Sequence, residues 1–284
     1  MSHPTTPPLS WLGSLLILSA QGMASEAIAP SDLKPGAYSH LQYLASTGET
    51  MHYYVYVPTG YSAEAKLPLL IEVHGAGPQP AKDGGGGSAR RYLGLNPNYA
   101  EAKYPCIFVE PMLNADWKVS CWDSKGWKTG SHTMDLKAPP KGIAILLEFL
   151  PKIIADLKSD PDRTYVTGAS NGGYATWDLI TYRPDLFAAA IPICGAGDPS
   201  QAARIKDLPI WTFHGTADPT VPFTGTTEMV AALEAAGGKP RHLYFEGMGH
   251  KSWDPAWKTP DLVPWLFAQN RSERAKATPA APTN

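Results

Sequence analysis

Three cysteines in 284 residues are too few for a disulfide scaffold, and their spacing matches no zinc motif. The 24 lysines and arginines are offset by 26 aspartates and glutamates, which argues against a nucleic-acid partner. Apolar runs long enough to cross a membrane are also missing. The sequence therefore predicts a protein with no membrane span, no metal and no cofactor motif.

The cysteines point to packing rather than cross-linking. Cys106 and Cys194 lie in or at the ends of apolar strand-like runs, where cysteine is usually a small buried hydrophobe. If the chain is exported, one bridge among Cys106, Cys121 and Cys194 stays possible. The sequence predicts neither a pairing nor an oligomeric state.

The two ends of the chain differ in composition from the middle. Residues 11–20 form an apolar run that leads to the small-x-small pattern Gly22-Met23-Ala24, which predicts a signal peptide over 1–24 and a secreted or periplasmic protein. No lysine or arginine precedes that run, so a cytoplasmic protein with an apolar leader is the alternative. Residues 272–284 are polar and rich in alanine and proline, which predicts a disordered tail. Residues 25–271 remain as one catalytic domain.

Strand-like and helix-like segments alternate along this domain. Two β-rich runs, 38–45 and 51–57, are joined by Ser46-Thr47-Gly48-Glu49 as a hairpin. Further strands are expected at 67–73, 106–110, 164–167, 188–193, 210–214 and 242–245, and helices at 143–157, 172–182 and 226–236. Such alternation predicts an α/β fold with a mostly parallel sheet, an N-terminal antiparallel hairpin and helices on both faces.

The segment Gly168-Ala169-Ser170-Asn171-Gly172 has the pattern G-x-S-x-G between an expected strand and an expected helix. In that context the turn forces the serine into a strained backbone conformation and exposes its hydroxyl as a nucleophile. The alternative is a glycine-rich turn with an ordinary serine, because the pentapeptide arises often by chance. Residues further along the chain favour the nucleophile.

A serine nucleophile needs a base and a carboxylate that orients the base. Asp218 follows one expected strand and His250 follows the next, so the order along the chain is serine, aspartate, histidine. This is the order of the α/β-hydrolases, with each residue in a loop after its own strand. We therefore expect Ser170, Asp218 and His250 to form a catalytic triad.

Other residues near these loops compete for the same roles. Asp198, Glu246 and Asp254 are rival carboxylates, although the last two lie very close to His250 in sequence. His214 precedes Asp218 by four residues and is expected to be a packing or hydrogen-bonding residue rather than the base.

The oxyanion hole is expected to use the backbone N–H of Asn171 together with one from the loop His74-Gly75-Ala76-Gly77. Ala76 is the first choice for the second donor, and Gly77 is the alternative. The glycine-rich run 83–88 lacks the G-K-[ST] ending of a phosphate loop and is expected to be a surface loop.

With these residues in place, the stretch 67–271 resembles α/β-hydrolases described as peptidases or phospholipase/carboxylesterases, which are relatives of polyhydroxybutyrate depolymerases and feruloyl esterases. The matching segments are VHGAG, DPDRTYVTGASNGGYATWDL, RPDLFAAAIPICGAGDP, LPIWTFHGTADPTVPF, GHKSWDPAW and WLFAQNR. The resemblance implies hydrolysis of carboxylic esters through an acyl-enzyme, without a cofactor. Asn171 stands where methionine is common in these relatives, and residues 116–134 have no counterpart there, which leaves the substrate open.

Tryptophans suggest what the substrate could be. Trp117, Trp122 and Trp127 crowd one loop and Trp253 follows His250, so aromatic platforms could hold a feruloyl group or a sugar bearing an acetyl ester. Simple packing of an irregular loop is the alternative. The sequence also leaves open a polyester depolymerase, a serine peptidase and a non-catalytic binding protein; the intact triad argues against the last.

Overall fold

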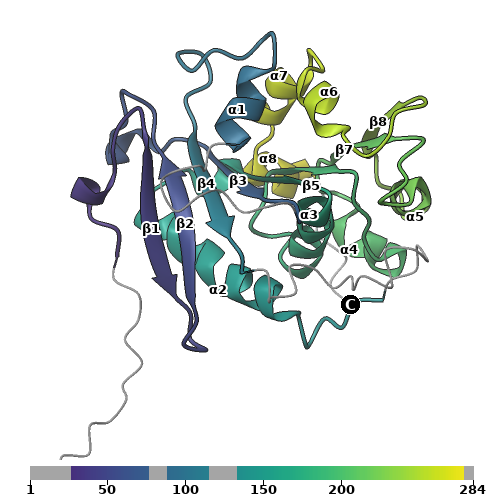
Figure 1. Ribbon diagram of the computed structural model, residues 1–284, viewed down its shortest axis with the longest axis horizontal. Coiled ribbons are helices and arrows are strands. Elements are labelled where there is room, and N and C mark those ends of the chain that lie inside the picture. Colours follow the sequence, from purple (N-terminus) through teal and green to yellow (C-terminus); the bar gives the residue numbers. More distant parts are fainter. Residues whose placement is uncertain (1–26, 77–87, 115–132, 278–284) are drawn as a thin grey trace, which may run out of the picture.

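The computed structural model describes residues 27–76, 88–114 and 133–277. Its described strands form one eight-stranded sheet in the order β1-β2-β4-β3-β5-β6-β7-β8 (Figure 1). The strands are β1 Tyr38–Leu44, β2 Thr50–Tyr56, β3 Leu69–Val73, β4 Ile107–Met112, β5 Thr164–Ala169, β6 Ala189–Ile193, β7 Trp211–Gly215 and β8 Arg241–Phe245. All of these strands were predicted from sequence to within a few residues.

The predicted mixture of pairings is confirmed. β1 pairs antiparallel with β2, and β2 pairs antiparallel with β4, whereas every other described pair from β4 to β8 is parallel. The predicted hairpin turn is also present: Gly48 adopts a φ of +88°, and the Ala45 N–H donates to the Glu49 carbonyl. Glu148 of helix α2 (Lys141–Asp156) accepts hydrogen bonds from Tyr43 and Ser46, which fixes the hairpin to that helix.

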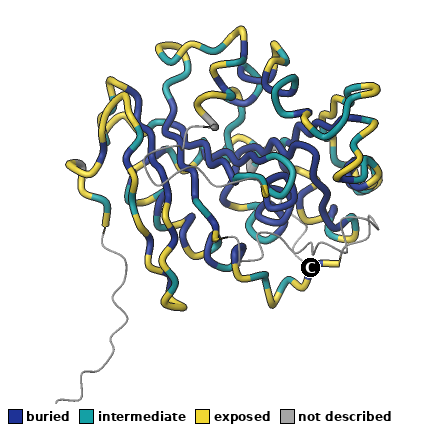
Figure 2. Tube along the Cα trace, in the orientation of Figure 1, coloured by how far each residue is buried: buried dark blue, intermediate teal, exposed yellow. Residues whose placement is uncertain are grey.

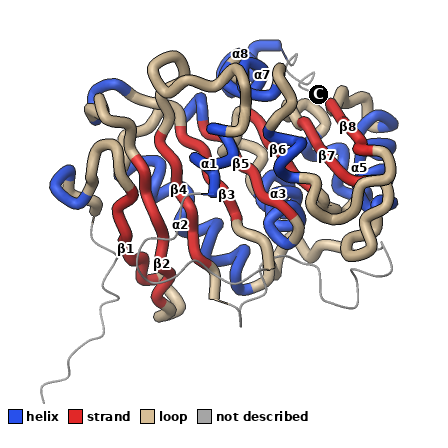
Figure 3. The backbone as a smooth tube through the Cα atoms, turned by 45° about the horizontal axis from the view of Figure 1, so that its top comes forward, coloured by secondary structure: helices blue, strands red, loops and turns tan. Residues whose placement is uncertain are grey.

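Helices cover both faces of the sheet, as the sequence predicts (Figure 3). The α-helices are α1 Ser88–Gly94, α2 Lys141–Asp156, α3 Asn171–Tyr182, α4 Ala202–Ile205, α5 Phe223–Ala235, α6 Trp253–Trp257, α7 Leu262–Phe267 and α8 Arg271–Ala277. Short 3-10 helices are η1 Pro30–Asp32, η2 Ala63–Ala65, η4 Pro161–Arg163 and η5 Pro199–Gln201. None of the described helices has both the length and the apolar character needed to cross a membrane.

Two apolar cores lie on the two faces of the sheet. Residues of α2, α3, α4 and α5 pack on one face, and residues of α1, α6 and α7 pack on the other. The central strands between them are buried along their whole length (Figure 2). A parallel strand buried on both faces reads as a continuous apolar run, which explains why segments such as Leu69–Val73 could be recognised from sequence.

One prediction about the chain ends needs correction. Residues 272–284 were expected to be disordered, but residues 271–277 form α8. The side chain of Asn270 accepts hydrogen bonds from the N–H groups of Ser272 and Glu273, which caps the helix. Arg274 donates to the carbonyls of Pro184 and Phe187, so tertiary contacts order a segment that has little apolar surface of its own. The predicted signal peptide, 1–24, lies outside the described residues.

Candidate active site

Ser170 stands at the sharp turn between β5 and α3. Its backbone has a φ of 58° and a ψ of −121°, a region that residues with a Cβ rarely enter, as the motif predicts. The two glycines of the motif allow the turn, because Cβ atoms at Gly168 and Gly172 would lie only 2.6 Å and 1.9 Å from the Val73 carbonyl oxygen. The turn therefore brings the start of α3 against the end of β3.

Three side chains from three separate loops form a continuous row of hydrogen bonds. His250 Nε2 lies 2.9 Å from Ser170 Oγ, and His250 Nδ1 lies 2.8 Å from Asp218 Oδ2. An ionised carboxylate can only accept, so the proton sits on Nδ1 and Nε2 is left to accept from the serine hydroxyl. The structure thus brings together the three residues that the sequence selects, in the orientation that proton transfer from Ser170 requires.

Asp218 is held as an anion. Its side chain is fully buried, which opposes ionisation, but hydrogen bonds from His214, His250, Val221 and Thr220 outweigh burial and hold the pKa of Asp218 far below its usual range. The N–H groups of Thr220 and Val221 donate to Oδ1 at 2.8 Å and 3.0 Å. The carboxylate is therefore charged and fixed opposite His250.

The rival carboxylates have other partners or positions. Asp198 is buried and accepts from the backbone N–H groups of Met134 and Ser200, which ties the chain around residue 134 to the end of β6. Asp254 lies 3.6 Å from the guanidinium of Arg91, and Glu246 is exposed. His250 has a hydrogen bond to Asp218 and to none of these three.

The loop after β3 lies beside the serine. His74 Nε2 accepts from the Leu113 N–H at 3.0 Å, so Nδ1 carries the proton and donates to the Gly75 carbonyl at 2.6 Å. Burial lowers the pKa of His74, in keeping with a neutral ring. A Cβ on Gly75 would lie 3.8 Å from the Cβ of Ser170, which measures how closely the loop approaches.

The two residues whose N–H groups are predicted to form the oxyanion hole lie next to this contact. Asn171 is the first residue of α3, whose helix N-terminus favours negative charge, and Ala76 is an exposed residue directly after Gly75. Gly77 lies outside the described residues, as do residues 83–87 of the glycine-rich run.

One of the tryptophans lies next to the histidine. The rings of Trp253 and His250 meet edge to face with their centroids 5.6 Å apart. Trp253 begins α6, so the same short helix follows His250 and places an aromatic wall beside it. Trp117, Trp122 and Trp127 lie outside the described residues.

Sequence reasoning did not anticipate the position of Cys194. This residue follows β6, adopts a φ of 39°, and its sulfur accepts from the Ser170 N–H at 3.3 Å. Cys106 and Cys194 are both free and buried, as their apolar surroundings predict, while Cys121 lies outside the described residues.

Cys194, Asp218 and His250 offer potential metal ligands within 4.8 Å of one another. A metal needs the thiolate, however, and burial raises the pKa of Cys194 to about 12. The arrangement suits proton transfer better than metal binding.

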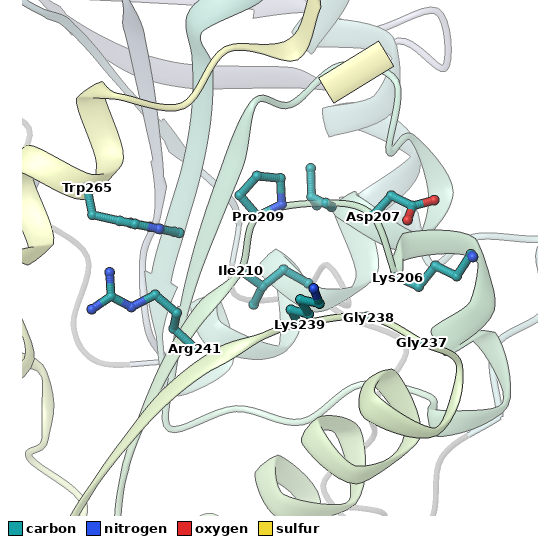
Figure 4. A pocket seen from close by; sticks show the side chains of 10 residues that line it. Lys206, Asp207, Pro209, Ile210, Gly237, Gly238, Lys239, Arg241 and Trp265 are labelled. Carbon is teal, nitrogen blue, oxygen red and sulfur yellow. The ribbon is translucent and has the colours of Figure 1, made fainter. Parts of the chain in front are cut away.

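A separate hollow of about 480 Å³ lies at the starts of β7 and β8 (Figure 4). Lys206, Lys239, Arg241 and Trp265 are among the residues that line it. Ser170, Asp218 and His250 follow the other ends of parallel strands, so this hollow and the serine face opposite edges of the sheet.

Comparison with known proteins points to hydrolases. The profile of the Prolyl oligopeptidase family matches residues 146–213. A solved structure of a thermostable esterase is 32% identical with a TM-score of 0.70, and the match covers 82% of this chain and 63% of that one.

Acetylxylan esterase A of Emericella nidulans is 26% identical over 203 residues, which are 70% of this chain and 60% of that protein. Feruloyl esterase B of Talaromyces funiculosus is 25% identical over 147 residues, which are 51% of this chain and 36% of that protein. The chain thus spans less than two thirds of the length of these relatives. The chain thus has the α/β-hydrolase fold, with its sheet order and its serine turn, and its sequence is similar to those of esterases.

Proposed function

We propose that this protein is a serine carboxylesterase with Ser170 as nucleophile, His250 as general base and Asp218 as the acid that orients the base. The observation that carries the proposal is the unbroken row Ser170 Oγ, His250 Nε2, His250 Nδ1, Asp218 Oδ2, with links of 2.9 Å and 2.8 Å. The strained backbone of Ser170 supports it, because such strain is retained where surrounding structure and function demand it.

The reaction follows from this geometry. His250 Nε2 takes the Ser170 proton as Oγ attacks the ester carbonyl, and Asp218 stabilises the imidazolium that forms. The N–H groups of Asn171 and Ala76 bind the oxyanion, a contribution of about 3 kcal/mol per donor. His250 then returns the proton to the leaving alcohol, and water releases the acid by the reverse route.

For the substrate, we propose esters in which a small acyl or aromatic acyl group is attached to a hydroxylated carrier. Trp253 beside His250 supplies an apolar wall near the reacting carbonyl, and two similar proteins are named for acetylxylan and feruloyl esters. The match to the prolyl oligopeptidase profile favours peptide amides as the second candidate substrate.

A substrate panel separates these possibilities. Purified protein is assayed on p-nitrophenyl acetate, p-nitrophenyl decanoate, methyl ferulate, acetylated xylan, a hydroxyalkanoate polyester and a peptide p-nitroanilide. Turnover of the acetyl or feruloyl esters with no release from the anilide supports the proposal. Cleavage of the anilide at a comparable kcat/KM would reassign the protein as a peptidase, and preference for the polyester as a depolymerase.

Three variants test the residue roles. Ser170→Ala and Asp218→Asn should each lower kcat on p-nitrophenyl acetate by about 10³-fold or more. Asp198→Asn is the matched control, because this carboxylate binds backbone N–H groups and does not contact His250. Full activity in Asp218→Asn together with loss in Asp198→Asn would overturn the choice of acid.

A further inference from the structure

A second histidine, besides His250, contacts the carboxylate of Asp218. His214 lies in β7, its side chain is fully buried, and its Nε2 is 3.2 Å from Asp218 Oδ2. This is the same oxygen that lies 2.8 Å from His250 Nδ1. The proposed mechanism uses His250 alone and assigns His214 no part.

The protons on His214 can be placed by its neighbours. Nε2 faces two acceptors, Asp218 Oδ2 and the Val221 carbonyl at 3.2 Å, so it must carry a proton. On the other side, Nδ1 lies 2.6 Å from Thr226 Oγ1, which is also 2.7 Å from the Gly195 carbonyl. The single hydroxyl proton of Thr226 serves either Nδ1 or that carbonyl, and in both cases Nε2 donates to Asp218.

The same contacts link the aspartate loop to the serine turn. Thr226 lies on α5 and reaches Gly195, and Gly195 packs so tightly on α3 that a Cβ there would lie 2.4 Å from the Gly173 carbonyl carbon. The ring of Phe223 meets His214 nearly perpendicular, with centroids 5.6 Å apart, and closes another side of the imidazole. His214 is therefore held by β7 and α5 at a fixed position behind Asp218.

We propose that His214 is a positioning residue for the reaction. Its Nε2–H holds Asp218 Oδ2 in the orientation that serves His250. Oδ2 therefore does not turn away from His250, toward the Thr220 and Val221 N–H groups that bind Oδ1, when His250 accepts the serine proton. This inference rests on the proposed function, since it assumes that Ser170 and His250 exchange that proton.

Two substitutions separate donation from simple packing. In His214→Gln the amide N–H can reach the position of Nε2, whereas His214→Leu fills similar space without a donor. We expect His214→Leu to lower kcat on p-nitrophenyl acetate by about 10- to 100-fold, with KM changed by less than about twofold. His214→Gln should recover most of the lost kcat. His242→Gln, in an exposed histidine of neighbouring β8 that stacks on Tyr244, is the matched control and should behave as wild type.

A spectroscopic readout tests the inference independently of turnover. The His250 Nδ1–H bound to Asp218 should give a far-downfield proton NMR resonance, which Asp218→Asn assigns by removing it. This resonance should persist in His214→Gln and shift or broaden in His214→Leu, even if none of the chosen esters is a substrate. If His214→Leu does not fold, Thr226→Val, which keeps His214 but removes the hydroxyl that contacts both its Nδ1 and the Gly195 carbonyl, should show the same change in weaker form.

Two results would overturn the inference. One is a folded His214→Leu protein with wild-type kcat and an unchanged His250 resonance. The other is an equal loss of kcat in His214→Gln and His214→Leu, which would mean that ring packing matters and donation does not. Absence of ester turnover in the wild type, with the resonance behaving as expected, would instead count against the proposed function alone.

Discussion

At the scale of single residues, the backbone of Ser170 adopts a strained conformation that exposes its side-chain hydroxyl at the turn. Its φ of 58° and ψ of −121° strain any residue with a Cβ, at a cost of about 1–3 kcal/mol, while glycine adopts such angles freely. In regular structure alanine is more stabilising than glycine by about 0.5–1 kcal/mol. We expect the opposite order at this position.

The prediction is that Ser170→Gly is more stable than Ser170→Ala by about 1 kcal/mol, although both are inactive. Urea unfolding followed by tryptophan fluorescence gives the two free energies of unfolding. Ser170→Ala unfolding at the higher urea concentration would show that the turn is not strained.

The two described thiols should be unreactive while the protein is folded. Burial raises the pKa of Cys194 to about 12 and also raises that of Cys106, and only a thiolate attacks a disulfide reagent. In a Cys121→Ser background, an aromatic disulfide reagent at about pH 8 should label neither thiol until denaturant returns their pKa to about 8.5. Because the folded pKa is the higher one, these thiols favour folding below about pH 8.5 and lose that contribution as the pH rises further. Rapid labelling of the folded protein would contradict this account.

At the scale of elements, the contact between α3 and β3 fixes the serine turn. A Cβ on Gly172 would lie 1.9 Å from the Val73 carbonyl oxygen, so Gly172→Ala must push the start of α3 away from the sheet. We expect a loss of about 1–3 kcal/mol in unfolding free energy, together with reduced ester turnover as the helix N-terminus moves.

Gly60→Ala serves as the control for that substitution. A Cβ there meets no atom within 4 Å, and its stability should stay within about 0.5 kcal/mol of wild type. Equal stabilities for the two variants in urea would mean that the close approach of α3 to β3 is not needed.

At the scale of the whole molecule, α8 ties a late segment of the chain to a much earlier one. Arg274 donates at 3.0 Å to both the Pro184 and the Phe187 carbonyls, just before β6 begins. Arg274→Ala should lower the free energy of unfolding by about 1.5–3 kcal/mol, because it leaves the partly buried Pro184 and Phe187 carbonyls without their charged donor. Kinetic constants on a good ester should stay close to wild type, since β6 starts at the edge of the sheet far from Ser170. A large drop in kcat without loss of stability would show that this contact serves the site and not the fold.

Much of this architecture could be predicted because it is local in sequence. Strands buried on both faces appear as apolar runs, the serine turn has its own glycine pattern, and the order Ser170, Asp218, His250 follows the order of the strands. α8 could not be predicted, because it depends on the cap from Asn270 and on carbonyls almost ninety residues away.

The candidate site also combines features that the sequence predicts with contacts that only the structure shows. Sequence selects Asp218 over Asp198 by order alone, and only geometry shows that Asp198 binds the Met134 and Ser200 N–H groups instead. The only sign in the sequence of the contact between His214 and Asp218 is their spacing of four residues across the end of a strand. That spacing does not show which nitrogen of the His214 ring faces the carboxylate.

The anchoring of α8 also bears on how this protein could be handled on a surface. Arg271 and Arg274 hold the helix against residues 162–187, beside the starts of β5 and β6, whereas Ser170 follows the end of β5. A solid support or a carbohydrate-binding module attached beyond Ala277 would therefore hold the protein at the edge of the sheet where the parallel strands begin. The edge of the sheet that carries the proposed active site would then face outward, where it could meet an insoluble polymer.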